Sequence, residues 1–153
     1  MLQMVNARLW EGTRNRLRVD EHVTCMLLRA TRAGDVEYAG AHETVLVLRD
    51  AGPCERIQST GTWLSVARDV STANTDRTLS LVPGDLLVLH SDGVIEARTP
   101  DGEPFGIDRL ATLVESGRAL PIAQLRDDVL DQVWQWAPQQ VDDVTLVIVR
   151  YLG

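Results

Sequence analysis

The sequence predicts an α+β fold in which antiparallel hairpins alternate with a few helices. Short apolar runs separated by turns rich in Gly, Pro and Asp fill much of the chain, as expected for successive hairpins. Helical periodicity is found only near the N-terminus and after residue 105. A chain of 153 residues, 44% apolar and 24% charged, is long enough to bury a core. We therefore expect residues 1–153 to form a single domain.

The first half of the chain is predicted to contain one helix and a series of short strands. Leu2, Val5 and Leu9 recur at helical spacing, and Gly12 or Asn15 is suited to end that helix. Apolar runs rich in β-branched residues, bounded by turn residues, predict strands. These strands span residues 22–30, 36–39, 45–48, 55–59 and 78–81, and a long polar loop occupies residues 61–76.

The strand predicted at residues 86–89 organises the second half of the chain. Pro83-Gly84-Asp85 is typical of a tight turn, because Pro presets φ, Gly accepts positive φ and Asp bonds its own backbone. The apolar run that follows has the length of a buried strand. It ends at Ser91-Asp92-Gly93, so a carboxylate is placed where the strand leaves the core.

Two helices and a last strand are predicted after this point. Apolar residues near residues 110–114 indicate a short helix that Gly117 closes. Apolar residues at steps of three and four indicate a second helix from Pro121 to residue 136. Residues 144–151 are apolar on both alternating faces, which predicts a strand buried from both sides.

Composition excludes several classes of function. The formal charge of −7 disfavours nucleic-acid binding, which depends on clustered basic residues. The absence of lysine excludes Schiff-base chemistry and a Walker A motif. No apolar run is long enough to cross a membrane and the N-terminus does not resemble a signal peptide, so we expect no membrane insertion and a cytoplasmic protein. Cys25 and Cys54 lie in strand-like runs and are expected to be buried structural thiols.

Carboxylates at two strand ends are the most promising chemistry in the sequence. Asp92 follows one strongly apolar strand, and Asp142 and Asp143 precede another. Carboxylate oxygens are the ligands that Mg²⁺ and Mn²⁺ prefer, so these residues are candidates for a metal site that activates water. The alternative is purely structural, since Asp-Gly is a common turn and Asp-Asp an ordinary polar boundary.

An ordered set of motifs resembles the SpoIIE/RsbU-type protein phosphatases, bacterial members of the metal-dependent PP2C-like family. The motifs lie at residues 38–42, 83–85, 91–98, 105–106 and 142–146. The resemblance implies a PP2C-like α-β-β-α sandwich of mainly antiparallel sheets with flanking helices. It also implies hydrolysis of phosphoserine or phosphothreonine on a bacterial regulatory protein of the anti-anti-sigma type, by water that two Mn²⁺ or Mg²⁺ ions activate.

The resemblance assigns residues to this site. Asp92 and Asp142 are the implied metal ligands and catalytic residues, with Gly93 and Asp143 in the same metal site. Either Asp142 or Asp143 could be the direct ligand. The earlier half of the family domain, which carries an Asp-Gly pair and a Gly-His-Gly stretch, is expected to be absent, so the chain corresponds to the later part of the domain.

Two alternatives to an active phosphatase remain at this stage, and the missing half has a structural consequence. The chain could be a pseudophosphatase that binds a sigma-factor regulator without turnover, or a structural β-sandwich module. Because strands of both sheets are expected to be missing, unpaired edges and an apolar surface favour self-association as a homodimer.

Overall fold

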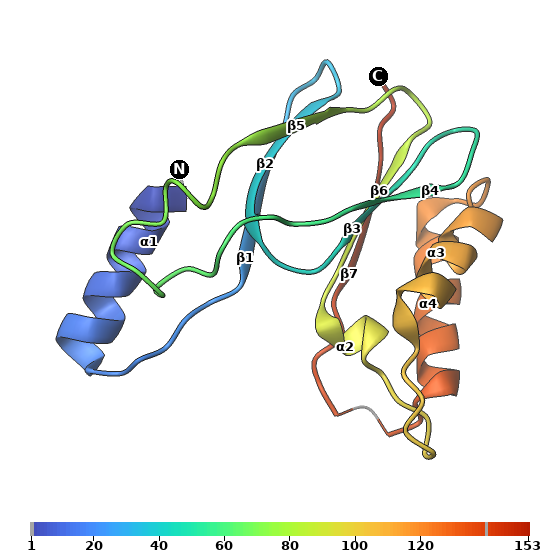
Figure 1. Cartoon of the computed structure of the whole chain (residues 1–153). Helices are drawn as coiled ribbons and strands as arrows, with labels where there is room; N and C mark the ends of the chain where they lie inside the picture. The colour runs from blue at the N-terminus through green and yellow to red at the C-terminus, as the bar shows by residue number, and fades with distance from the viewer. Residues whose placement is uncertain (1, 140) are drawn as a thin grey trace. The chain divides into compact units, whose positions relative to one another are not determined.

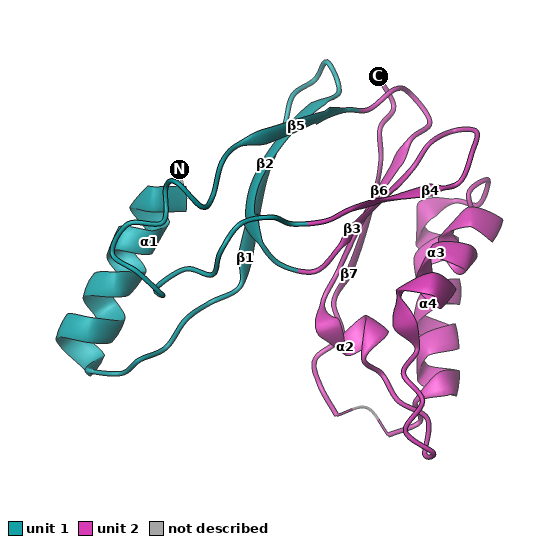
Figure 2. Ribbon diagram, viewed as in Figure 1, with its two compact units in different colours: residues 1–42, 59–80 teal, residues 43–58, 81–153 magenta. Residues whose placement is uncertain are grey.

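The computed structural model describes residues 2–139 and 141–153, which form two compact units (Figures 1 and 2). The first unit comprises residues 1–42 and 59–80, and the second comprises residues 43–58 and 81–153. Each unit has its own antiparallel sheet and its own buried apolar cluster. In the described residues, no helix has the length and apolar character needed to cross a membrane.

The first unit is a three-stranded antiparallel sheet with an N-terminal helix. The strand order is β1-β2-β5. Its elements are α1 (Leu2–Trp10), the π-helical segment η1 (Glu11–Leu17), β1 (Cys25–Ala30), β2 (Asp35–Ala41) and β5 (Arg77–Ser80). Leu2, Ala39, Leu64 and Val70 form its buried cluster. The predicted helix is therefore present, but it continues past Gly12 to Leu17 in π-helical geometry.

The second unit is a four-stranded antiparallel sheet with three helices. The strand order is β4-β3-β6-β7, which places β6 in the interior and β7 at an edge. Its elements are β3 (Val45–Leu48), β4 (Cys54–Ile57), β6 (Leu86–His90), α2 (Asp92–Ile95), α3 (Gly106–Ser116), α4 (Ile122–Trp136) and β7 (Leu146–Arg150). The strands and helices predicted for this half are thus present, with boundaries shifted by a few residues.

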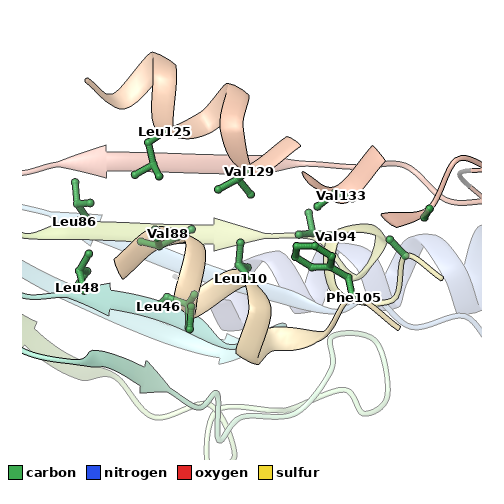
Figure 3. Packing of buried hydrophobic residues seen from close by; sticks show 14 residues of the cluster. Leu46, Leu48, Leu86, Val88, Val94, Phe105, Leu110, Leu125, Val129 and Val133 are labelled. Carbon is green, nitrogen blue, oxygen red and sulfur yellow. The ribbon is translucent and has the colours of Figure 1, made fainter. Parts of the chain in front are cut away.

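The core of the second unit lies between its sheet and helices α3 and α4 (Figure 3). Leu86 and Val88 are two residues apart on β6, so they share one face of the sheet. Leu125 and Val129, one helical turn apart on α4, are buried against the same cluster. Each of these side chains contributes about 1.5–3 kcal/mol when it is removed from water.

The predicted turn before β6 is held by a buried carboxylate. The Asp85 side chain is fully buried and accepts hydrogen bonds from the backbone N–H groups of Val82 (3.0 Å) and Asp50 (3.1 Å) and from the Arg49 guanidinium (2.9 Å). Burial raises the pKa of Asp85, but these hydrogen bonds lower it more, and the net pKa lies below its ordinary value. The turn is therefore stabilised by the ionised form of Asp85.

The prediction for residues 144–151 is wrong in one respect. Val147 and Val149 of β7 are 42% and 44% exposed, so the strand is covered on one face only. Ile148, by contrast, packs against the core of the second unit. An apolar residue on each face predicted burial on both, but β7 is an edge strand, and only one of its faces meets the helices.

The two tryptophans of α4, Trp134 and Trp136, differ in burial as their spacing on the helix requires. Trp134 is 51% exposed, whereas Trp136 packs against the core. The Trp136 indole N–H donates to the Glu103 carbonyl (3.0 Å), and the Arg109 guanidinium lies 3.9 Å from its ring centroid. Residues two positions apart on a helix point in different directions, which explains the different exposure of the two tryptophans. The contacts of Trp136 with Glu103 and Arg109 fasten the end of α4 to α3 and to the loop before it.

Candidate active site

Asp92 lies at the junction of β6 and α2. The strand ends at His90, Ser91 keeps an extended backbone, and Asp92 begins the helical turn. The Asp92 carboxylate accepts a hydrogen bond from the N–H of Gly93 (2.9 Å), and its carbonyl accepts one from the N–H of Glu96 (2.8 Å). Asp92 is exposed, as a residue that contacts a ligand must be.

Asp142 and Asp143 lie just before β7 and are also exposed. The Asp142 carboxylate accepts a hydrogen bond from the N–H of Asp143 at 2.8 Å. This contact ties the Asp142 side chain to the adjacent peptide just before the chain enters β7.

Ser91 fastens these two segments together. Its hydroxyl donates to the Asp143 carbonyl (3.0 Å) and accepts from the Thr145 N–H (2.9 Å), while its own N–H donates to the Thr145 carbonyl (3.0 Å). These bonds extend the β6–β7 ladder, whose last pair is His90 and Leu146. The antiparallel register therefore places Asp92 and Asp142–Asp143 beyond the same end of the sheet.

Gly93 allows the close approach of the two segments. A Cβ atom built at this position would lie 2.3 Å from the carbonyl oxygen of Asp143. This distance is far shorter than an ordinary contact, so any larger residue would force the segments apart. Gly93 is buried, and its role in this structure is to let the Asp92 and Asp143 backbones pack closely.

The side chains of this site offer the kind of ligand atom that a hard divalent cation prefers, but too few of them lie close together. Asp92, Asp142 and Asp143 offer carboxylate oxygens, the ligands that Mg²⁺ and Mn²⁺ select. Among residues 2–139 and 141–153, however, no group of three or more His, Cys, Asp or Glu side chains is close enough to hold a metal ion. The described residues thus place carboxylates from two segments at one end of the sheet, without three side chains that could together hold a metal ion.

A pocket of about 480 Å³ lies beside these carboxylates. It is lined by residues 93, 96–100, 138, 139, 141 and 142. Gly93 and Asp142 therefore belong to the pocket and to the carboxylate site. The pocket lies wholly within the second unit.

Sequence reasoning did not find the role of Ser91 or the pocket. The sequence marked Ser91 only as the point where the strand ends, although its hydroxyl joins the two strand ends. The neighbouring His90 is buried, with its Nδ1 atom 3.1 Å from the Ser91 carbonyl oxygen. The alternation of Leu86, Val88 and His90 was a signal that this ring faces inward.

His42 belongs to the first unit, where its backbone exchanges two hydrogen bonds with the Ser59 hydroxyl.

Comparison with known proteins decides the family. Residues 1–152 match the family described as Stage II sporulation protein E (SpoIIE). The chain belongs to the SpoIIE family. This SpoIIE-family chain is also 31% identical over 123 residues to Protein IcfG of Synechocystis sp., a match that covers 76% of the chain and 18% of IcfG.

Solved structures show the fold of this SpoIIE-family chain. The SiaA-PP2C domain of Pseudomonas aeruginosa matches with a TM-score of 0.78 at 16% identity, covering 95% of this chain and 59% of that one. The phosphatase domain of SpoIIE from Bacillus subtilis, presoaked with Mn, matches with a TM-score of 0.59 at 18% identity, covering 84% of this chain and 56% of that one. The predicted PP2C-like fold is confirmed, and the chain spans less than two thirds of these relatives.

Proposed function

We propose that this SpoIIE-family chain is the later part of a single metal-dependent phosphatase domain that hydrolyses phosphoserine or phosphothreonine. The substrate class is a phosphorylated bacterial regulatory protein of the anti-anti-sigma type, in the cytoplasm. The observation that carries the proposal is the clamp by which Ser91 joins the Asp92 segment to the Asp142–Asp143 segment. Family membership supports it, because PP2C-like phosphatase domains share this fold.

In this proposal Asp92 and Asp142 would hold Mn²⁺ or Mg²⁺, with Gly93 and Asp143 in the same site. A divalent ion held by these residues would lower the pKa of a bound water molecule and so supply the nucleophile. The chain's own part is to orient the carboxylates. Ser91 fixes the spacing of the two segments, and Gly93 leaves room for the Asp143 carbonyl.

Metal binding tests the assignment of the ligands. Two carboxylates leave most coordination to water, so calorimetry on the 153-residue chain should show weak Mn²⁺ binding that Asp92→Ala abolishes. Asp128→Asn, a change at an exposed residue of α4, is the matched control and should leave binding unchanged. Submicromolar Mn²⁺ affinity that survives Asp92→Ala would show that the ligands are assigned wrongly.

Activity tests the reaction. Since the described residues contain no cluster of three metal-binding side chains, we expect little hydrolysis of p-nitrophenyl phosphate or a phosphoserine peptide by these 153 residues. Addition of the family's earlier segment, with its Asp-Gly and Gly-His-Gly motifs, is expected to restore Mn²⁺-dependent turnover. Binding of a phosphoprotein without turnover in the completed domain would favour a pseudophosphatase.

The proposed partners include a second copy of the chain. The apolar face of α1 is a weak candidate for this contact, because Leu2 is buried and Leu9 packs against the first unit's core. The exposed Val147 and Val149 on edge strand β7 are better candidates. Light scattering should show a dimer that Val147→Lys with Val149→Lys converts to monomer, and a wild-type monomer at high micromolar concentration would refute it.

A further inference from the structure

The pocket beside the carboxylates has an apolar lining and a charged rim. Ala97, Pro100, Pro138 and Val141 supply the apolar surface. Ala97 is buried, whereas Val141 is 98% exposed at the margin. A volume of about 480 Å³ lies within the roughly 300–1,000 Å³ of typical ligand sites.

One wall of the pocket is formed by residues 96–100, which lead into a hydrogen-bonded hairpin turn. The Thr99 N–H donates to the Glu103 carbonyl (3.0 Å), and the Gly102 N–H donates back to the Thr99 carbonyl (2.8 Å). The Arg98 guanidinium also donates to the Gly102 carbonyl at 2.9 Å. Because these bonds hold the turn, this wall is formed before any ligand binds.

The charges around the pocket favour a basic ligand. Glu96 and Asp142 line the pocket, and Asp92 and Asp143 adjoin it in sequence, whereas Arg98 is the one basic residue among the described residues of its lining. The Arg98 side chain is already engaged with the hairpin turn. Complementary charge on a ligand raises its rate of encounter and fixes its register.

We propose that this pocket receives the side chain that immediately precedes the phosphorylated residue of the substrate, and that this side chain is apolar and preceded by a basic residue. The proposal rests on the proposed phosphatase function. In a peptide whose phosphate lies at Asp92 and Asp142, the Cα atom of the preceding residue lies about 3.8 Å from the Cα atom of the phosphorylated residue. Asp142 and Gly93 belong to both sites, so that residue lies at the pocket, and the basic residue before it faces Glu96.

The test is an NMR titration of the isotope-labelled chain in Mg²⁺ with short synthetic peptides. The reference probe is acetyl-Gly-Lys-Leu-phosphoserine-Gly-Gly-amide, and in two variants Gly replaces Leu or Glu replaces Lys. We expect the Leu peptide to bind about tenfold more tightly than the Gly peptide. It should shift the amide signals of Ala97, Thr99 and Val141. Replacement of Lys by Glu should weaken binding further.

Val141→Asp is the diagnostic variant, because its side chain is almost fully exposed and its loss does not disturb the core. It should abolish the preference for Leu over Gly, whereas Val82→Asp, the same change at another exposed valine, should preserve it. Equal affinity for the Leu and Gly peptides, or no binding at millimolar concentration, would overturn the proposal.

Unphosphorylated peptides separate the pocket from the proposed function. If the preference for Leu persists and phosphate adds nothing even after the family's earlier segment is added, the pocket is supported and the phosphatase assignment fails. If phosphate strengthens binding without any preference for Leu, the phosphatase assignment is supported and the pocket proposal fails.

Discussion

Replacement of Gly93 by Ala should separate the two halves of the carboxylate site. The added Cβ atom would lie 2.3 Å from the Asp143 carbonyl oxygen and 3.0 Å from its carbon. An ordinary contact begins at 3.4 Å, so the Asp143 backbone must retreat by about 1 Å. The Ser91 hydroxyl, which donates to that same carbonyl at 3.0 Å, loses its partner in the process.

The magnitude follows from three contributions. Overpacking of a close contact costs about 1–3 kcal/mol, and loss of the Ser91 bond adds about 1 kcal/mol. The reduced freedom of the unfolded chain offsets about 0.4–1 kcal/mol of this. Gly93→Ala should therefore lower the free energy of unfolding by about 1–3.5 kcal/mol.

Urea unfolding followed by tryptophan fluorescence measures the stability, and calorimetry measures Mn²⁺ binding. Gly93→Ala should also weaken Mn²⁺ binding, since the Asp92 and Asp142 segments move apart. The control is Gly12→Ala, because nothing lies within 4 Å of its added Cβ, and it should be neutral or stabilising by up to about 1 kcal/mol. A Gly93→Ala protein with the wild-type urea midpoint and Mn²⁺ affinity would refute the role given to this glycine.

Three further predictions concern single side chains. Asp85→Asn should cost about 2–3 kcal/mol at pH 7. Because the folded-state pKa of Asp85 is lowered, that stabilisation is present above its unfolded pKa of about 3.9. This stabilisation is lost as the pH falls through the folded-state pKa of Asp85, so the urea midpoints of the wild type and Asp85→Asn should converge in acid. A difference between the two midpoints that stays constant with pH would contradict this account. Burial raises the pKa of Cys54 to about 11, so its reaction with Ellman's reagent at pH 8 should be roughly a hundredfold slower than in urea; equal rates would contradict this. Ser91→Ala should weaken Mn²⁺ binding severalfold by freeing the Asp143 carbonyl, whereas unchanged calorimetry would exclude a clamping role.

Local sequence patterns predicted the helices, strands and turns because each pattern depends on residues close together in the sequence. The stripe of Leu125, Val129 and Val133 on α4 repeats every four residues and is buried as expected. The turn at Asp85 was predictable because Pro, Gly and Asp each have a conformational reason to be there. Its buried hydrogen bonds to Arg49 and Asp50 were not, since those partners lie 36 and 35 residues away.

Exposure of β7 was not predictable for a similar reason. Val147 and Val149 favour burial because they are apolar, but the elements packed around β7 decide whether they are buried. A strand at the edge of a sheet and one in its middle can have the same alternation. Only the order β4-β3-β6-β7 distinguishes the two cases.

The candidate site derives its geometry from the sheet. Five residue pairs between β6 and β7, from Leu86 with Arg150 to His90 with Leu146, set the register of the two strands. A slip of one residue would turn Leu86 and Val88 away from the core, so the core enforces this register. The same register holds the Asp92 segment beside the Asp142–Asp143 segment, because Asp92 lies two residues and Asp142 four residues beyond the last pair of the ladder. The carboxylates were therefore visible in the sequence as separate strand ends, whereas the packing of their two segments against each other is a property of the folded sheet and its core.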